Sequence, residues 1–130
     1  MKDLFSVKER VIVITGATGI LGSSMVEHFA EQGAKVVILG RNREAGTRLE
    51  REAKANGGEA LFLECNVLDK ESLERCYEAI MATYGRIDVL INNAGIDTQP
   101  SAPPEVSGPF ENFPEEVFRE VVDVNLVGTF

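Results

Sequence analysis

The chain has 130 residues, of which 44% are hydrophobic and 26% charged, and its formal net charge is −8. This length allows one folded domain, the composition excludes a disordered tail, and an acidic chain without clusters of lysine and arginine is a poor nucleic-acid binder. No apolar run approaches the roughly 20 residues of a membrane helix, and the N-terminus lacks the pattern of a signal peptide. We therefore expect a cytoplasmic protein with neither a membrane nor a nucleic-acid partner.

Short apolar runs alternate along the chain with longer amphipathic segments. Strands are predicted at residues 10–15, 35–40, 59–67 and 87–95, and helices at residues 19–33, 42–58, 69–85 and 114–130. A proline-rich loop, residues 96–113, precedes the last helix. This alternation predicts an α/β fold with a doubly wound parallel sheet of the Rossmann type and helices on both of its faces.

The third predicted helix carries an apolar stripe, on which Tyr77 and Tyr84 are expected to be core residues. The stripe consists of Leu73, Cys76, Tyr77, Ile80, Met81 and Tyr84, and the first helix is marked by Leu21, Met25 and Phe29. Cys65 and Cys76 are the two cysteines of the sequence. They are expected to be small core residues rather than metal ligands or a disulfide, and no metal site is predicted.

Ligands of such sheets bind at the carboxyl ends of the strands. The predicted fold brings four segments to that edge, namely residues 16–22, 40–42, 66–67 and 92–95. The first lies in the stretch VITGATGILGSSM, which joins a strand to a helix and so presents free backbone N–H groups and the positive end of a helix dipole. Both favour a pyrophosphate, although a tight turn without a ligand is the alternative. The stretch is not a P-loop, because no Gly-Lys-Ser/Thr sequence follows.

The motifs TGATGILG (residues 15–22), NNAG (92–95) and DVNLVGTF (123–130) together resemble the short-chain dehydrogenase/reductase family, in order and over essentially the whole chain. The resemblance implies hydride transfer between a nicotinamide cofactor and a carbonyl or secondary alcohol of a small-molecule substrate, and a homo-oligomer, dimer or tetramer, for the full-length parent. It implies that the cofactor contacts Gly16, Thr18, Gly19, Ile20, Leu21 and Gly22, and also Asn93, Ala94 and Gly95.

The glycine spacing departs from the commonest pattern of that family. Ile20 stands where the single-domain members usually have their middle glycine, and Gly19 comes one residue early. This spacing is commoner in the longer branch that modifies sugar nucleotides, whereas NNAG and VNLVG favour the single-domain oxidoreductases. The combination also resembles the sugar-acid reductases that act on mannonate or fructuronate.

The residues after the second and third strands bear on the choice of cofactor. NAD enzymes usually place an acidic residue after the second strand, but this chain has Gly40 there, followed by Arg41 and Asn42. Arg41 suits a 2′-phosphate, so NADP(H) is preferred over NAD(H), with a solvated surface arginine as the alternative. The resemblance further implies that Asn66 accepts a hydrogen bond from the adenine amino group and that Val67 offers its backbone to the ring.

Asn125 is the catalytic residue that the resemblance implies, since it matches the helix asparagine that holds a proton-relaying water in the family. A helix asparagine bonded to its own backbone is the alternative. The family's Ser, Tyr and Lys have no counterpart here. We interpret residues 1–130 as a cofactor-binding half-domain that ends within the Asn125 helix, with the fourth strand left as an open edge. The alternative is a complete nucleotide-binding remnant without catalysis.

Overall fold

The computed structural model describes residues 3–97 and 102–130. The chain divides into two compact units, Met1–Asn93 and Ala94–Phe130. The first unit contains the sheet and three long helices, and the second contains short helical segments. The division falls inside the NNAG motif, so the predicted site residues are shared between the two units.

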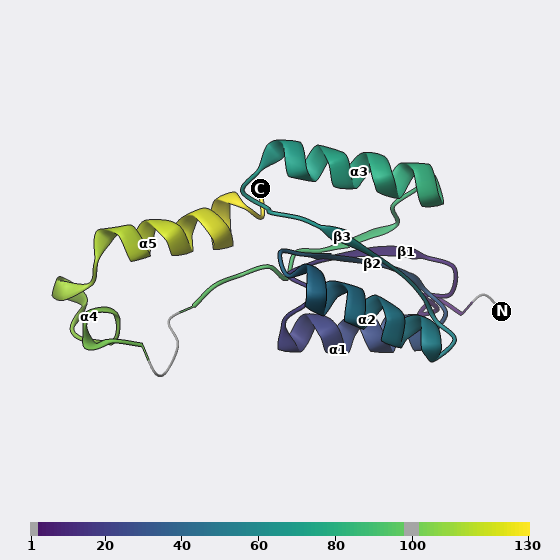
Figure 1. Cartoon of the computed structure of the whole chain (residues 1–130), viewed down its shortest axis with the longest axis horizontal. Helices are drawn as coiled ribbons and strands as arrows, with labels where there is room; N and C mark the ends of the chain where they lie inside the picture. Colours follow the sequence, from purple (N-terminus) through teal and green to yellow (C-terminus); the bar gives the residue numbers. More distant parts are fainter. Residues whose placement is uncertain (1–2, 98–101) are drawn as a thin grey trace. The chain divides into compact units, whose positions relative to one another are not determined.

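The first unit is built on one parallel sheet with the strand order β3-β2-β1-β4. Its strands are β1 (Val11–Thr15), β2 (Lys35–Gly40), β3 (Glu59–Glu64) and β4 (Val89–Ile91), and its helices are α1 (Ile20–Glu31), α2 (Arg43–Ala55) and α3 (Lys70–Tyr84). Helices α1 and α2 cover one face of the sheet and α3 covers the other (Figure 1). The predicted doubly wound α/β architecture is therefore confirmed. Within the described residues, β4 pairs only with β1 and lies at an edge of the sheet.

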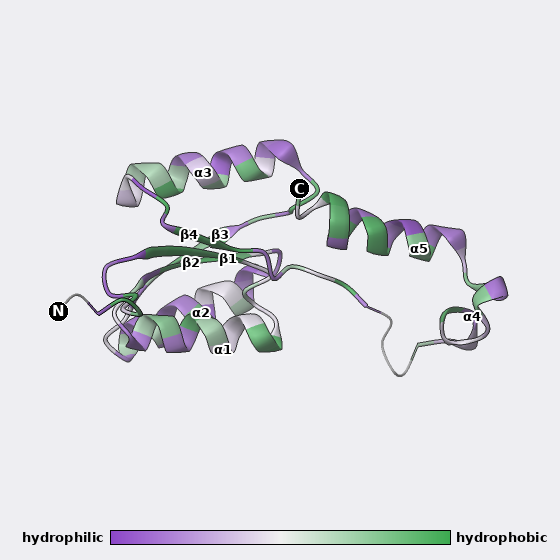
Figure 2. Ribbon diagram, turned by 180° about the vertical axis from the view of Figure 1, so that it is seen from behind, coloured by the Kyte–Doolittle hydropathy of each residue, from purple (hydrophilic) through white to green (hydrophobic). Residues whose placement is uncertain are grey.

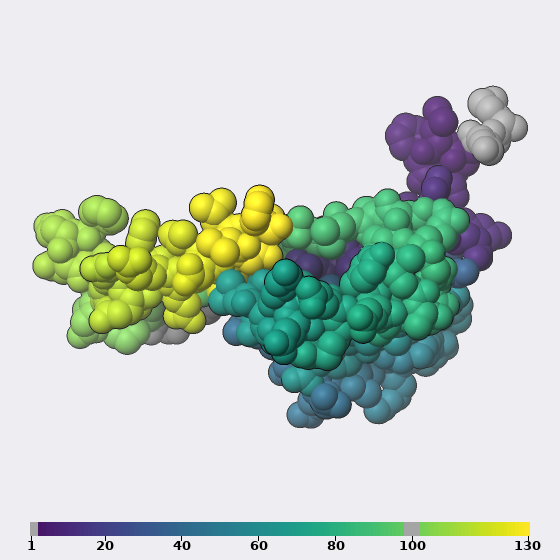
Figure 3. Space-filling view, turned by 90° about the horizontal axis from the view of Figure 1, so that it is seen from above, coloured from purple at the N-terminus to yellow at the C-terminus, as the bar shows by residue number. Residues whose placement is uncertain are grey.

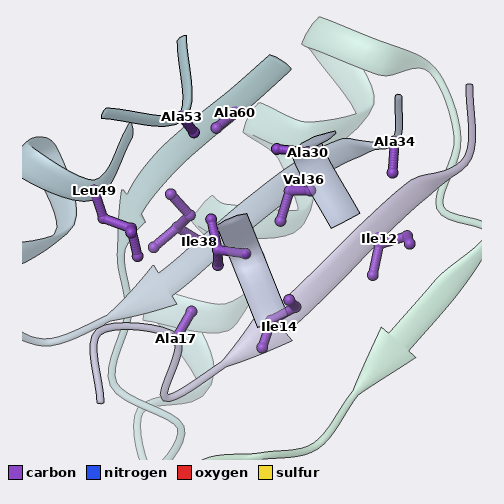
Figure 4. Close-up of a cluster of buried hydrophobic side chains, with 11 residues drawn as sticks. Ile12, Ile14, Ala17, Ala30, Ala34, Val36, Ile38, Leu49, Ala53 and Ala60 are labelled. Atoms are coloured by element: carbon purple, nitrogen blue, oxygen red, sulfur yellow. The ribbon is translucent and has the colours of Figure 1, made fainter. Parts of the chain in front are cut away.

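Two hydrophobic clusters fill the space on the two faces of the sheet. Successive residues of a strand point to opposite faces, so Ile12 and Ile14 of β1 face α1 and α2, while Val11 and Val13 face α3. Figure 4 shows the first cluster, and Figure 2 shows that the strands between the helices are the most hydrophobic part of this unit. Cys65 and Cys76 are buried free thiols in the second cluster, as predicted.

Helix α1 packs against the glycine turn through small residues. The buried residues of this helix are Gly22, Val26 and Ala30, and the half-buried Met25 and Phe29 pack against the first cluster. A Cβ on Gly22 would lie 2.6 Å from both the Ala17 Cα and the Gly16 carbonyl oxygen, so the helix can approach the loop this closely only with a glycine at this position. Leu21, which is predicted to contact the cofactor, is 67% exposed.

The predicted stripe of α3 is only partly correct. The buried residues are Ser72, Cys76 and Ile80, spaced four apart, while Tyr77 is 56% exposed. Tyr77 was predicted to be a core residue and that prediction is wrong. Tyr84 does pack against the second cluster, where burial, aided by the Glu59 carboxylate, raises the pKa of its hydroxyl to about 12. Figure 3 shows the outer surface that α3 forms on the first unit.

The later elements are shorter than predicted. Strand β3 ends at Glu64 rather than at residue 67, and β4 covers only three residues. The proline-rich segment contains α4 (Pro104–Ser107) and a 3₁₀ turn, η1 (Phe110–Asn112), where only a loop was predicted; residues 98–101 lie outside the described residues. The last helix divides into α5 (Glu115–Val122) and a π-helical turn, η2 (Asp123–Val127).

Candidate functional site

The glycine-rich stretch forms a tight turn between β1 and α1. Gly16 adopts a left-handed conformation with φ of 62°. The Ala17 N–H then donates to the Leu39 carbonyl at 3.0 Å, which fixes the turn against β2, and the Gly19 N–H donates back to the Gly16 carbonyl at 3.2 Å. The turn is therefore held by its own backbone and by the neighbouring strand.

Helix α1 begins without a capping side chain. Its N-cap is Gly19, and the first turn, which starts with Ile20 and Leu21, contains no acidic residue. By contrast, α2 and α3 are capped by Asn42 and Asp69, and each has a glutamate in its first turn. The first N–H groups of a helix have no acceptor within the helix, so the start of α1 keeps its donors and its positive partial charge available to an anion.

Thr18 and Gly40 meet where the turn passes the end of β2. A Cβ on Gly40 would lie 2.8 Å from the Thr18 Cγ2 and 2.9 Å from its Oγ1, so a side chain at position 40 would displace Thr18. Position 40 is the one at which an acidic residue would mark an NAD enzyme. The packing of Thr18 and the lack of an acidic group at this position are thus linked.

Asn93 holds the glycine turn in place from the end of β4. Its backbone N–H donates to the Thr15 Oγ1 at 3.1 Å, and its side-chain Nδ2 donates to the carbonyls of Thr15 and Gly16 at 3.1 and 3.2 Å. The amide donors of Asn93 are thus directed at the backbone of the turn. Thr15, which the sequence reasoning did not select, is part of the same arrangement.

A pocket of about 540 Å³ opens at the carboxyl ends of β2 and β3. It is lined by Arg41, Arg43, Glu64, Cys65, Asn66, Asp69, Ser72 and Arg75. The Arg43 guanidinium is held by the Glu64 carboxylate, with the Nε and Nη2 atoms 2.9 and 2.6 Å from Oε2. Within the described part of the chain Arg41 forms no ion pair, so its guanidinium is available to an anionic ligand.

Asn42 and Asn66, two of the residues predicted to contact the cofactor, hold the loops in which they lie. Asn42 caps α2, with its Oδ1 accepting from the Ala45 N–H at 3.0 Å. The Asn66 Oδ1 accepts from the Leu68 N–H at 3.0 Å, and the Asn66 N–H donates to the buried Ser72 Oγ at 3.1 Å.

Ser72, which supports Asn66 in this way, was not predicted from the sequence. The spacing Asp69-x-x-Ser72 at the start of α3 is the signal that points to it. Val67, next to Asn66, is half-buried.

Asn125 lies in the second unit, on the π-helical turn η2, where the Gly128 N–H donates to the Asp123 carbonyl at 2.7 Å. The Asn125 Oδ1 accepts from the Ile96 N–H at 2.8 Å, and its Nδ2 donates to the Ile96 carbonyl at 2.9 Å. Neither bond is to its own helix, so the alternative of a self-bonded helix asparagine is not what the structure shows. Asn125 fastens the segment directly after NNAG. A Cβ on Gly95 would lie 3.3 Å from the Asn125 Oδ1, and Ala94 is half-buried.

Two other classes of site are absent from residues 3–97 and 102–130. No group of three or more His, Cys, Asp or Glu side chains is placed to hold a metal ion. In the same residues, none of the helices has the length and apolar character needed to cross a membrane. The structural evidence for ligand binding therefore lies in the glycine turn and in the arginine-lined pocket of the first unit.

The sequence matches the family model of the short chain dehydrogenases over residues 10–130. Among curated proteins it is 32% identical over 122 residues to a 3beta-hydroxysteroid dehydrogenase of Mediterraneibacter gnavus. It is 38% identical over 129 residues to the uncharacterized oxidoreductase UxuB of Bacillus subtilis. These alignments cover 94% and 93% of this chain but 42% and 46% of the relatives. The chain thus spans less than half the length of these relatives.

Solved structures show the same fold. An NAD⁺-bound xylitol dehydrogenase has a TM-score of 0.85 at 29% identity, over 95% of this chain and 45% of its own. An NAD-bound proposed D-mannonate oxidoreductase from Haemophilus influenza has a TM-score of 0.83 at 27% identity, over 95% of this chain and 47% of its own. A metagenomic short-chain oxidoreductase in complex with NADP has a TM-score of 0.81 at 30% identity, over 95% of this chain and 52% of its own.

Proposed function

The chain belongs to the short-chain dehydrogenase family, and we propose that it carries the cofactor site of an oxidoreductase that interconverts a carbonyl and a secondary alcohol on a small substrate. A nicotinamide nucleotide, when bound, supplies or accepts the hydride. The related dehydrogenases and the nucleotide-bound neighbours support a cofactor of this class. The residues of this chain bind and orient that cofactor.

The observation that carries the proposal is the uncapped start of α1 beside the left-handed Gly16. The N–H groups of Ile20, Leu21 and Gly22 suit the pyrophosphate, because they lack acceptors within the helix and lie where its dipole favours negative charge. The closely packed Gly22 keeps this helix start against the turn. Asn93 fixes the Gly16 carbonyl, so the turn is formed before a ligand arrives.

We propose NADP(H) as the preferred cofactor, with NAD(H) as the alternative. Gly40 offers no carboxylate to a ribose 2′-hydroxyl, and Arg41 beside it, which has no ion pair with any described residue, suits a 2′-phosphate. Asn66 and Val67 would flank the adenine from the other side of the same pocket. Because the Asn66 Oδ1 already accepts from Leu68, any bond from the adenine amino group would use its second lone pair.

Asn125 acts in this proposal by positioning rather than by proton transfer. Both polar atoms of its amide bind the Ile96 backbone, which keeps Ala94, Gly95 and Ile96 in one conformation. The family resemblance implies that this segment borders the nicotinamide. The Ser and the Tyr-x-x-x-Lys pair of that resemblance are not matched in residues 1–130. We therefore assign the proton-transfer step to no residue of this chain.

The substrate class to test first is a sugar acid. Two findings support this choice, namely the likeness to the proposed D-mannonate oxidoreductase and the combination of glycine spacing, NNAG and VNLVG, which resembles reductases of mannonate or fructuronate. A steroid alcohol is the competing candidate, because a hydroxysteroid dehydrogenase is among the similar proteins. Turnover of each class with NADPH or NADH would distinguish them. Tight cofactor binding without turnover of either would favour the non-catalytic alternative.

Cofactor choice is tested by fluorescence titration with NADPH and with NADH. Arg41→Ala is expected to weaken NADPH binding roughly 10- to 100-fold, because a hydrogen bond to a charged group contributes about 1.5–3 kcal/mol. The affinity of Arg41→Ala for NADH is expected to stay within about 2-fold of the wild-type value, since NADH lacks the 2′-phosphate that Arg41 would contact.

Arg51→Ala is the matched control. Arg51 is an exposed arginine on α2 that does not line the pocket at β2 and β3, so its loss removes the same charge without removing the proposed contact. Equal affinities for the two nucleotides, unchanged by Arg41→Ala, would contradict the preference for NADP(H). If neither NADPH nor NADH bound, the cofactor site itself would be contradicted.

A further inference from the structure

Two thiols lie together beneath the pocket at the end of β3. Cys65 directly follows β3 and Cys76 lies on α3, and each is 4% exposed. The Cys76 Sγ donates to the carbonyl of Glu64, the residue before Cys65, at 3.6 Å. The two side chains also belong to one hydrophobic cluster. The two reduced thiols are thus neighbours in the core of the first unit.

Only one of the two thiols faces the pocket. Cys65 is one of its lining residues, beside Ser72 and Asn66, whereas Cys76 is not. A small solute in the pocket is therefore closer to Cys65 than to Cys76, which does not line the pocket. This ordering is that of an attacking thiol with a second thiol placed to react with its product.

The hydrogen bonds around Cys65 favour its thiolate. Hydrogen bonding to Cys76, with help from the Ser72 hydroxyl, lowers the pKa of the Cys65 thiol against the opposing effects of burial and of the Asp69 carboxylate. The same pairing and burial raise the pKa of the Cys76 thiol. The thiolate is the reactive form, so the thiol that lines the pocket is also the more nucleophilic one. The charged groups around the pocket are Arg41, Arg43, Glu64, Asp69 and Arg75.

We propose that Cys65 and Cys76 form a redox-active thiol pair that a peroxide converts to a disulfide. The Cys65 thiolate attacks one oxygen of hydrogen peroxide, the O–O bond breaks, and a sulfenic acid and a hydroxide ion form. The Cys76 sulfur then attacks the sulfenic sulfur. The S–S bond forms, the S–O bond breaks, and the hydroxyl group leaves with the Cys76 proton as water. In total two thiols are oxidised and one peroxide is reduced to two waters.

The test is peroxide treatment of the folded protein, followed by alkylation of the remaining thiols and peptide mass spectrometry. The expected result is one disulfide that joins the peptides of Cys65 and Cys76, and loss of both alkylation sites. Its rate should rise with pH and level off below the range in which an ordinary thiol, with a pKa of about 8.5, ionises, because the pKa of the Cys65 thiol is lowered. Because the chain without substitutions is used, this measurement does not depend on whether a variant folds.

Two variants separate the roles of the sulfur atoms. Cys76→Ser is expected to stop at the sulfenic acid, which a 1,3-diketone reagent traps on Cys65. Cys65→Ser is expected to slow oxidation of the remaining thiol at least 10-fold, because Cys76 is shielded and its thiolate is disfavoured. A disulfide that forms only in denaturant, or equal oxidation rates for the two variants, would overturn the proposal. Neither outcome depends on whether a nucleotide binds.

Discussion

At the scale of single residues, most polar side chains of this site bind the protein backbone. Asn42 caps a helix, Asn66 closes a turn, and Asn93 fastens the glycine turn to β4. The contacts left for a ligand are therefore backbone N–H groups and the Arg41 guanidinium. Such a site is rigid before binding, because its polar side chains already have partners.

Gly22 tests how closely α1 must approach the glycine turn. In Gly22→Ala the new Cβ would meet the Ala17 Cα and the Gly16 carbonyl oxygen at 2.6 Å, and both are backbone atoms that cannot rotate away. We expect the free energy of unfolding in urea to fall by about 1–3 kcal/mol, as for other overpacked sites. Nucleotide binding should weaken as well, because the turn must shift.

Ser24→Ala is the control for this substitution. Ser24 is exposed on the same helix, so alanine there is expected to change the free energy of unfolding by no more than about 0.5 kcal/mol. If Gly22→Ala were as stable as Ser24→Ala, the close contact between α1 and the turn would not exist in solution.

At the scale of elements, the sequence predicted which segments form strands and helices better than it predicted which way they face. The central strands are apolar on both sides, so their place in the sheet follows from composition alone. In α1 the buried residues include Gly22, and no periodicity reveals that this residue must be small, because the limit arises from its contact with Gly16 and Ala17. Tyr77 was wrongly predicted as a core residue, since the face of α3 that packs on the sheet holds Ser72, Cys76 and Ile80.

The connection between α3 and β4 is held to β1 by one carboxylate. The Asp88 Oδ2 accepts from the Val11 N–H at 2.8 Å, and its Oδ1 pairs with Arg86 and, at 3.4 Å, with Arg10. The bonds from Arg86 and Val11 lower the pKa of Asp88 to about 2. A depressed carboxylate pKa stabilises the folded state above the unfolded pKa of about 3.9, and this stabilisation is lost as the pH falls toward the folded value.

Asp88→Asn is therefore expected to lower stability near neutral pH and to matter less in acid. The measurement is the urea midpoint of wild type and variant from about pH 6 down to about pH 2, and the difference should shrink below about pH 4. Glu74→Gln is the control, because Glu74 is an exposed carboxylate whose pair with Lys70 spans 3.8 Å on the surface. A difference between wild type and Asp88→Asn that stayed constant over the whole range would show that the charge of Asp88 is not what stabilises this connection.

At the scale of the whole molecule, the described chain consists of a sheet-containing unit and a shorter helical unit. The strand order could be expected because alternating strands and helices restrict the topology. The boundary inside NNAG could not be expected, since that motif is continuous in sequence. The π-helical turn that carries Asn125 could not be predicted either, because the sequence there has the ordinary amphipathic pattern of an α-helix.

Strand β4 gives the sheet an edge whose consequences can be measured. Within the described residues it pairs with β1 on one side, and Val89 and Leu90 are 39% and 56% exposed. An unpaired edge with apolar side chains is a template for pairing with another chain, and a lysine on such an edge opposes this pairing.

We expect the protein to self-associate as its concentration rises, measured by sedimentation velocity. Leu90→Lys should shift that association to at least 10-fold higher concentration. Leu4→Lys makes the same charge change at an exposed leucine outside the sheet and should leave the association as it is. Equal effects of the two substitutions would mean that net charge, and not the β4 edge, governs association.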